Sequence, residues 1–414
     1  MRRVVITGMD AISPIGNDLA TIESNLRNGR SGIDSIDLHY KEELPVQIAG
    51  AIKEFDASAY IKKKERKRLN RFLQISIVNG LRAFAHAGLD ACAYDANRFG
   101  IVYGSGIGGV NTLLEDHCVM LNKGWQYVGP FHIPMTIANE AAGYLAIKLS
   151  AHGPNKTPVN ACATGTIAIG DAFHIIKHGY ADIMLAGAAE SAMNPLSFTG
   201  FYALQSLADE RVYDTPQQAS RPFDKARTGF VIGEGAAAVV LEERQHALER
   251  NATIYGEIVG YGASSDAYHI TAPDPRGLGA VLCMQWALAD GGVSKDQINY
   301  INAHGTSTPL NDKTETKAIK SLFGERAYSI PVNATKSMTG HLLGAAGAFE
   351  TIAILLQINS HFLHPTINQE QADPECDLDY VANSHRQYTI EYALSNSFGF
   401  GGQNGSLLIC RYKD

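Results

Sequence analysis

Four side chains that could carry out chemistry follow predicted strands: Cys162, His304, Lys336 and His341. The run Pro-Val-Asn-Ala precedes Cys162 and occurs again shortly before Lys336 and His341. Each copy reads as a short β-rich run, a polar turn and a helix-like segment, which suggests two copies of one fold unit. A third motif, Asn302–Pro309, ends another apolar run and contains His304. A cysteine, a lysine and two histidines at strand ends of a duplicated chain predict thiol chemistry on an acyl group.

Cys162 is the predicted nucleophile. A cysteine reacts as the thiolate, and a helix N-terminus lowers the thiol pKa through unpaired N–H groups and the helix dipole. Cys162 stands between a predicted strand and a predicted helix, and so has this setting. The alternative is that it is buried and inert, as free cysteines usually are. His304 and His341, two of fourteen histidines, have the same ordinary alternative. Their shared position at Gly-rich strand ends favours catalysis.

Composition narrows the class of protein. The chain has 414 residues, 45% hydrophobic content and a net charge of −7, which is typical of a soluble globular protein with a large core. The negative charge argues against a general nucleic-acid or anionic-membrane binder. No apolar run approaches the roughly 20 residues that span a bilayer, and we expect no signal or transit peptide. The six cysteines form no Cys-x-x-Cys pair, which predicts reduced thiols in a cytoplasmic protein.

The predicted elements that position these residues alternate between strands and helices. Such alternation predicts an α/β protein of mostly parallel sheets with helices on both faces. The opening strand at Val4–Gly8 has a counterpart at Ile254–Gly260. We therefore expect an N-terminal half at 1–253, which carries the cysteine, and a C-terminal half at 254–414, which carries the lysine and both histidines.

Other segments are less specific. Phe230–Gly235 and Ala236–Leu241 are predicted as a strand pair that closes the first half. Residues 98–109 form a predicted strand that ends in four glycines, which permit a tight turn or a close ligand approach. A nucleotide site is not predicted there, because the acidic residue of a dinucleotide site and a P-loop are both missing. Ile61–Phe72 is a dense basic run, and such a run by itself is most often a solvated helix face.

These motifs together resemble those of the elongating β-ketoacyl-acyl-carrier-protein synthases, members of the thiolase superfamily. The resemblance covers essentially the whole chain. It implies a thiolase fold, in which two pseudo-repeated βαβαβαββ halves form a five-layer αβαβα sandwich. The motifs that carry it are Ala161–Gly165, Arg221–Asp224, Gly229–Gly235, Asn302–Thr308, Thr335–His341 and Asn396–Gly402.

The resemblance implies a decarboxylative Claisen condensation. Malonyl-acyl carrier protein reacts with an enzyme-bound acyl chain to give 3-oxoacyl-acyl carrier protein, in fatty acid elongation. Cys162 takes up the acyl group, and the backbone N–H groups of Cys162 and Phe400 form the oxyanion hole. His304 and His341, as neutral imidazoles that donate through Nε2, contact the malonyl thioester carbonyl.

Further site residues follow from the same resemblance. Lys336 is a supporting cation near His341, held by Glu350 or Glu315. The hydroxyls of Thr306 and Thr308 contact the pantetheine arm, or alternatively only cap a turn. Ile107 and Phe201 shape the acyl tunnel, and Phe398 and Phe400 lie on a Gly-rich gating loop.

The resemblance also implies partners. Lys64, Lys67 and Arg68 match a patch that docks the acidic acyl carrier protein. No cofactor of the protein's own is implied, because the substrates arrive on the carrier's phosphopantetheine. We expect a homodimer, with a heterodimer with a chain-length factor as the alternative, and neither nucleic acid nor a membrane as a partner. A structural cation without a catalytic role is implied near Asn302, Glu350, Ser395 and Asn396.

Departures from the family pattern leave alternatives open. Gln403 stands where many relatives have Thr, and Glu140 replaces a usual apolar residue near the end of the acyl pocket. Both motivate a second hypothesis, a ketosynthase of a specialised type II polyketide or polyene pathway paired with a chain-length factor. A third is a non-catalytic carrier-docking subunit, which would typically lack Cys162. A degradative thiolase would need a second cysteine in a Cys-x-Gly setting, which neither Cys376 nor Cys410 has.

Overall fold

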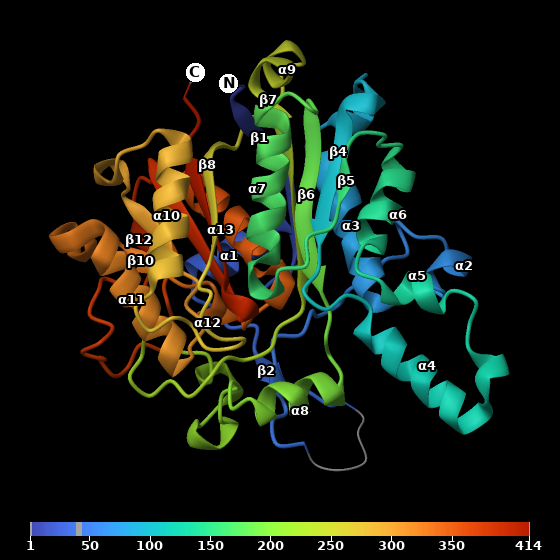
Figure 1. The fold of residues 1–414 in the computed structure, drawn as a ribbon, viewed down its shortest axis with the longest axis horizontal. Coiled ribbons are helices and arrows are strands. Elements are labelled where there is room, and N and C mark those ends of the chain that lie inside the picture. The colour runs from blue at the N-terminus through green and yellow to red at the C-terminus, as the bar shows by residue number, and fades with distance from the viewer. Residues whose placement is uncertain (1, 39–43, 414) are drawn as a thin grey trace.

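A continuous ten-stranded sheet forms the centre of the molecule (Figure 1). The computed structural model describes residues 2–38 and 44–413. The first half of the chain contributes β1 (Val4–Ile12), β4 (Phe99–Gly104), β5 (Asn155–Lys156), β6 (Ile183–Glu190) and β7 (Gly235–Glu243). The second half contributes β8 (Gly256–Ser265), β9 (Tyr300–Asn302), β10 (Val332–Asn333), β13 (Tyr392–Gly399) and β14 (Gln403–Cys410).

Both halves arrange their strands in the same order. From its edge inward, the first half runs β5-β4-β6-β7-β1 and the second runs β10-β9-β13-β14-β8. In each half, β7 or β14 runs antiparallel to its two neighbours, and the other paired strands are parallel. The identical topology confirms the predicted repeat. The prediction of a mostly parallel sheet is wrong: among the described residues the sheet is mixed, and five of its nine strand pairings are antiparallel.

The two halves meet where β1 pairs with β8. Val4 pairs with Ile258 and Ile6 with Gly256 in an antiparallel register, so the repeats share one sheet at this point. The predicted boundary between 253 and 254 falls between α9 (Arg244–Glu249) and β8. That boundary stays a prediction.

Helices cover the outer faces of both halves of the sheet. The helices α3 and α6 pack on the first half, and α10 and α11 pack on the second. Apolar side chains of these helices and of the strands beneath them form two separate outer cores. The helix bounds are α3 (Arg71–His86), α6 (Glu140–Leu149), α10 (Leu278–Gly291) and α11 (Pro309–Phe323).

Two further helices, α7 (Thr164–Lys177) and α13 (Ala346–Ser360), lie between the two halves of the sheet. The resulting order of helix, sheet, helix, sheet and helix is the five-layer arrangement expected from the sequence. A helix that is apolar on all sides belongs in such an interior. The segment Leu343–Ser360 is long and apolar enough to cross a membrane by composition, yet 89% of it is buried inside the molecule. It is the core helix of the fold and places Glu350 at the centre.

The remaining helices and short strands complete the fold. Figure 1 shows α4 and α5 standing away from the main body. The other helices are α1 (Leu19–Arg27), α2 (Lys63–Arg66), α4 (Val110–Lys123), α5 (His132–Thr136), α8 (Pro195–Ala203) and α12 (Lys336–Thr339). The small strands are β2 (Asp34–Ser35) with β3 (Ile48–Ala49), and β11 (Phe362–Leu363) with β12 (Arg386–Gln387).

One predicted strand does not form. Ala236–Leu241 belongs to β7, but the preceding segment makes only isolated bridges, from Phe230 to Leu207, from Ile232 to His341 and from Gly233 to Gly50. The prediction of a strand pair is therefore wrong. The segment instead runs beside the turn that carries His341, because the sheet offers the segment no continuous partner strand.

Candidate active site

Cys162 lies at the turn into the central helix α7. The strand β5 leads to a 3-10 turn over Ala161–Ala163, and α7 begins at Thr164. Ala161 has a left-handed backbone with φ of 49°, which is uncommon and costly for a residue other than glycine. The Thr164 hydroxyl stabilises this turn, because it donates to the Ala161 carbonyl and accepts from the Asn160 N–H, both at 2.8 Å. The strained turn presents the thiol at the start of a helix, where the sequence predicts it.

Burial decides the protonation state of Cys162. It raises the pKa of the thiol to about 11, although the Lys336 ammonium and the N–H groups of Phe400 and Cys162 act to lower it. The expectation of a lowered pKa is therefore wrong, because the cost of desolvating the thiolate outweighs the nearby cation and dipoles. The thiol is the resting form at neutral pH, so acyl transfer must move its proton as well as form the C–S bond.

Two backbone N–H groups, its own and that of Phe400, act on the Cys162 thiol and lower its pKa. The close approach of the second depends on Gly399, at the end of β13. A Cβ there would lie 2.8 Å from the Asn160 carbonyl oxygen and 3.3 Å from the Cys162 nitrogen. Only glycine allows two backbones to come so near. The pair of N–H groups can hold an oxyanion on a carbon bonded to the sulfur.

His304 and His341 lie side by side in the interior. Their ring centroids are 5.4 Å apart, with the rings nearly perpendicular at 82°. Each side chain is almost fully buried. Burial, followed by the Lys336 charge, holds the pKa of both imidazoles well below the usual range. Both rings are therefore neutral at physiological pH.

A hydrogen bond assigns the tautomer of His341. The Leu343 N–H donates to His341 Nδ1 at 3.2 Å, so Nδ1 is the acceptor and the proton resides on Nε2. Within the described residues, the buried Nε2 has no protein partner. Since His341 also lines the cavity beside Cys162, this Nε2–H is available as a donor to a bound oxygen.

Lys336 connects the histidines to the central helix. Its ammonium donates to the His304 carbonyl at 2.6 Å and forms a buried ion pair with Glu350 of α13. Of the two carboxylates expected as its partner, Glu315 instead accepts the N–H groups of His304 and Gly305, at 2.8 and 2.9 Å. One carboxylate therefore holds the lysine and the other holds the backbone turn of His304.

Cys162, His304 and His341 line one cavity of about 300 Å³, and Lys336 lies outside its lining. Thr308 caps α11 by accepting the Asn311 N–H at 3.3 Å, and its hydroxyl lies 2.9 Å from that of Thr306. Both threonines nevertheless face the cavity, so capping and cavity lining occur together. Ile107 lies outside the lining and is 39% exposed. The predicted site residues that the cavity brings together are Cys162, Phe201, His304, Thr306, Thr308, His341, Phe398 and Phe400.

Sequence reasoning missed several lining residues. Phe230 packs edge-on against His341, with centroids 5.4 Å apart. Asp266 accepts from the Asn404 side chain at 2.7 Å at the same cavity. Outside the lining, Gln403, noted only as a departure from the family, accepts a hydrogen bond from Asn160 beside the nucleophile turn. The motif around Phe230 was a signal for one of these residues, whereas the other contacts join positions far apart in the chain.

The expected cation site can be tested by its polar atoms. Within the described residues, Asn302 Oδ1, Glu350 Oε2 and Ser395 Oγ are buried without a hydrogen-bond partner. Asn396 Oδ1 already accepts from Ser406 at 2.9 Å. Oxygen atoms of this kind are the ligands that a hard cation prefers, so the chemistry of these three groups fits the expected cation. Within residues 2–38 and 44–413, there is no cluster of three or more His, Cys, Asp or Glu side chains that could hold a metal ion.

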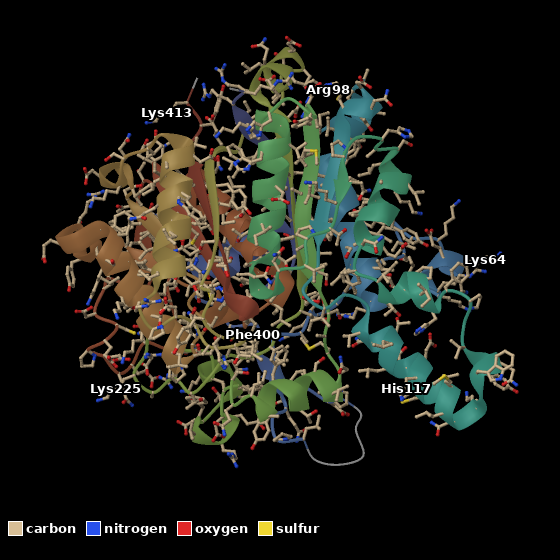
Figure 2. All side chains as sticks on the ribbon, in the orientation of Figure 1. Lys64, Arg98, His117, Lys225, Phe400 and Lys413 are labelled. Atoms are coloured by element: carbon tan, nitrogen blue, oxygen red, sulfur yellow. The ribbon has the colours of Figure 1, made fainter. Side chains whose placement is uncertain are left out.

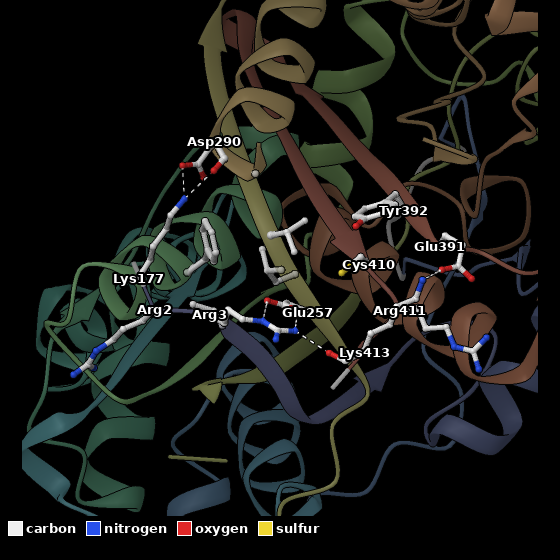
Figure 3. A pocket seen from close by; sticks show the side chains of 15 residues that line it. Arg2, Arg3, Lys177, Glu257, Asp290, Glu391, Tyr392, Cys410, Arg411 and Lys413 are labelled. Atoms are coloured by element: carbon white, nitrogen blue, oxygen red, sulfur yellow. Dashed lines mark hydrogen bonds and ion pairs between the residues drawn. The ribbon is translucent and has the colours of Figure 1, made fainter. Parts of the chain in front are cut away.

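A second cavity, of about 420 Å³, lies between the two ends of the chain (Figure 3). Its charged side chains are largely neutralised by pairs such as Arg3 with Glu257 and Lys177 with Asp290. Figure 2 places Lys413 of this cavity at the opposite end of the molecule from Phe400. Although it is larger, it contains none of the predicted reacting groups, and the cavity at Cys162 is the candidate active site.

The predicted docking residues Lys64, Lys67 and Arg68 are exposed on and after α2. Arg68 lies over the ring of Phe131, 5.2 Å from its centroid. Figure 2 shows Lys64 on the side of the molecule that carries α4 and α5, well separated from Phe400. These residues form a surface patch outside the cavity.

The fold and the site together define a class of protein. A thiol at a helix start, backed by N–H donors and two neutral histidines on a duplicated α/β fold, is the arrangement of a condensing enzyme that joins acyl groups. The beta-ketoacyl synthase N-terminal domain model matches residues 1–247, and the C-terminal domain model matches residues 255–370. The chain belongs to the beta-ketoacyl synthase family, as the resemblance predicted.

Full-length relatives share one name. The chain is 48% identical over 412 residues to a 3-oxoacyl-[acyl-carrier-protein] synthase 2 of Synechocystis, covering 100% of this chain and 99% of the relative. It is 45% identical over 413 residues to the protein of that name in Coxiella burnetii, with the same coverage. The prediction of a β-ketoacyl synthase enzyme is confirmed.

Solved structures agree on the fold. A beta-ketoacyl synthase from Burkholderia phymatum superposes with a TM-score of 0.91 at 35% identity, and all of both chains is covered. A type II polyketide ketosynthase, solved with its acyl carrier protein, superposes with a TM-score of 0.92 at 36% identity, covering 99% of this chain and 100% of that one. The thiolase-like α/β fold class is confirmed.

Proposed function

We propose that this protein condenses malonyl-acyl carrier protein with an acyl chain held on Cys162, giving 3-oxoacyl-acyl carrier protein in fatty acid elongation. One observation carries the proposal. The Cys162 thiol, two backbone N–H groups and the free Nε2–H of His341 line the same cavity. This set can stabilise two successive oxyanions, one on the acyl carbonyl and one on the malonyl thioester.

In the first half-reaction, the Cys162 sulfur attacks the acyl thioester carbonyl. The N–H groups of Cys162 and Phe400 hold the tetrahedral oxyanion. The C–S bond to the carrier breaks, and the proton of the Cys162 thiol ends on the departing carrier thiol. The products are an acyl-cysteine and a free carrier.

In the second half-reaction, malonyl-carrier takes the vacated space. His304 and His341 donate to its thioester carbonyl, and the electron pair of the breaking C–C bond forms an enolate as carbon dioxide leaves. The enolate carbon attacks the acyl-cysteine, and Cys162 departs as a thiolate that regains a proton. Burial keeps both imidazoles neutral, and the Lys336 charge adds to this effect because it disfavours their protonation.

The substrates supply their own carrier arm, so the proposal includes no cofactor of the enzyme's own. Thr306 and Thr308 present adjacent hydroxyls at the cavity and suit the amides of a pantetheine arm. Phe201 and Phe398 add apolar walls near the thiol. We assign the gating role to the turn at 400–402, where Gly401 and Gly402 both adopt the positive φ that glycine favours.

The acyl carrier protein is the proposed partner, and the site is proposed to act in the cytoplasm. The exposed cations Lys64, Lys67 and Arg68 suit an acidic carrier. Charge reversal in K64E/R68E should raise the KM for carrier substrates in a salt-sensitive way and leave turnover of small thioesters unchanged. The control K413E reverses an exposed lysine at the far end of the molecule. An equal rise of KM in the control would contradict docking at the patch.

We further propose that two copies associate as a homodimer. Large apolar side chains are exposed on α4, α5 and the turn between them, including Leu121, Trp125 and Ile133. The neighbouring strand β5 is an unpaired edge of the ten-stranded sheet within the described residues. An apolar surface beside an open sheet edge is typical of a subunit interface. Solved ketosynthase relatives include one paired with a chain length factor, at 33% identity and a TM-score of 0.88, so a heterodimer is the competing arrangement.

Single-turnover condensation by the purified protein alone tests the function. Acyl-carriers from acetyl to palmitoyl are each mixed with malonyl-carrier, and the 3-oxoacyl product is quantified. Activity on saturated medium and long chains is expected. Activity confined to short, unsaturated or aromatic acyl groups, or dependent on a partner subunit, would instead place the protein in a specialised polyketide or polyene pathway. No acyl transfer to Cys162 under any condition would overturn the enzyme assignment.

A further inference from the structure

Glu190 is a fully buried carboxylate beside the candidate site that the proposed reaction does not use. It is the last residue of β6, at the edge of the sheet where the strand ends meet the cavity. Its electrostatic effect reaches Cys162, whose pKa it raises. Because this carboxylate does not touch the reacting atoms, its role must follow from the segments to which it is hydrogen-bonded.

Four donors surround Glu190. Oε1 accepts the Ser105 hydroxyl at 2.9 Å and the Ile107 N–H at 3.2 Å. Oε2 accepts the Gly106 N–H at 2.7 Å and the Gly344 N–H at 3.2 Å. Burial raises the pKa of Glu190 above its usual value, and these hydrogen bonds act to lower it. Because every partner donates, the carboxylate uses its full acceptor capacity, as an ionised group would. A neutral amide could not accept all four bonds.

These donors come from two segments that are distant in the sequence. Ser105, Gly106 and Ile107 form the turn after β4, whereas Gly344 follows the turn that carries His341. The two segments touch directly, because a Cβ on Gly344 would lie 2.4 Å from the Gly106 nitrogen. Glu190 lies against both and ties one to the other.

The same junction adjoins both halves of the candidate site. A Cβ on Gly106 would lie 3.4 Å from the carbonyl oxygen of Ala161, the residue before the nucleophile. On the other side, Leu343 precedes Gly344 and donates the N–H that assigns the His341 tautomer. Leu343 and Ala161 are both held at a φ of 49°, so each turn is strained and depends on its neighbours.

We propose that Glu190 is a positioning residue for this enzyme: its carboxylate ties the turn after β4 to the Leu343–Gly344 turn, and thereby maintains His341 as the Nε2–H donor next to the Cys162 turn. The proposal rests on the proposed function, because it assigns the role of His341 in decarboxylation. It adds a residue that touches neither substrate nor reacting atom.

Isosteric replacement separates this role from simple packing. In E190Q, two of the four donors meet an amide NH₂ and lose their acceptor, which frees the Leu343–Gly344 turn. Decarboxylation of malonyl-carrier should fall by about tenfold to a hundredfold, since a displacement near 1 Å of a catalytic group can cost about a hundredfold. The imidazole ¹⁵N spectrum should show His341 changing from the pure Nε2–H form to a mixture, with the His341 signal identified by its absence in H341N.

In E190Q the Cys162 thiol should become more reactive, whereas decarboxylation should become slower. Removing a nearby negative charge should move the midpoint of its alkylation by iodoacetamide to lower pH, by about one unit. The other charged or titratable groups around this thiol are Lys336, the neutral His304 and His341, and Asp266 on the same cavity, and all are retained in E190Q. Because unfolding would also expose this thiol and abolish decarboxylation, both readouts are taken on E190Q protein whose circular dichroism spectrum and melting temperature match those of the parent.

Two variants keep the test decisive if E190Q is unstable. E190D retains the charge but shortens the reach, so decarboxylation should fall while the alkylation midpoint stays. E242Q removes another fully buried carboxylate, on β7 opposite the far end of β6, and should change neither readout. Normal decarboxylation in E190Q and E190D would overturn the proposal, as would an equal loss in E242Q. Absence of decarboxylation in the unmodified enzyme would instead overturn the proposed function.

Discussion

Removal of the His341 donor is the sharpest perturbation of the second half-reaction. The ring is buried and neutral, its Nδ1 is occupied by the Leu343 N–H, and its Nε2–H is free. His341→Ala therefore deletes one preorganised donor and leaves His304 as the other. Loss of one such donor typically lowers kcat by about 10²–10³, or about 2.7–4 kcal/mol of transition-state stabilisation.

The decline should be specific to decarboxylation. Release of labelled carbon dioxide from malonyl-carrier is measured in a Cys162→Ala background, where acyl transfer is absent. The double variant H304A/H341A should lose less than the product of the two single effects, because both donors serve one oxygen. The rings lie close enough for this, with centroids 5.4 Å apart.

His364 supplies a matched control. It is also fully buried, burial lowers its pKa to about 4, and it is outside the cavity. His364→Ala removes the same volume of imidazole without removing a donor from the site. If H341A lowers decarboxylation by less than about threefold, or if H364A lowers it equally, the donor role inferred for His341 is refuted.

Three further outcomes are expected. Cys162→Ala should take up no acyl group, as intact-protein mass spectrometry would show, yet still release carbon dioxide from malonyl-carrier; acylation of this variant would identify another nucleophile. Because the pKa of Cys162 is raised to about 11, its alkylation rate should climb as pH rises through neutrality and level off only near that value, and a plateau below pH 8 would contradict burial as the dominant effect. Lys336→Met leaves Glu350 as an unpaired buried carboxylate and should cost about 3–5 kcal/mol of stability, in part restored in K336M/E350Q. Since the lysine charge lowers the pKa of both histidines, K336M should also lose decarboxylation at mildly acidic pH where the parent does not, and identical pH profiles would refute that influence.

Much of the fold was predictable because local sequence patterns specify its strands and helices. The repeated Pro-Val-Asn-Ala run and the alternating elements indicated two copies of one α/β unit, and the strand order confirms them. The irregular structure of Phe230–Gly235 was not predictable in this way. Its apolar residues look like a strand, but a strand needs a partner, and the sheet offers only single bridges there.

The sequence by itself determined which residue types stand at the strand ends, and so the identity of Cys162, His304, Lys336 and His341 as candidates. Tertiary structure decided how they behave. The sign of the thiol pKa shift follows from burial, which a helix-start position does not reveal. The choice of Glu350 as the partner of Lys336 is likewise a matter of packing around the central helix.

The contacts that complete the site join distant parts of the chain. Glu190 meets Ser105 and Gly344 only because β6 ends between two turns, and nothing in its local sequence signals this. The residues within a strand or helix largely determine it, so its hydrophobic periodicity can be recognised in the sequence. Desolvation and hydrogen bonding in the interior depend on which segments the fold brings together, and they become visible only when all layers are in place.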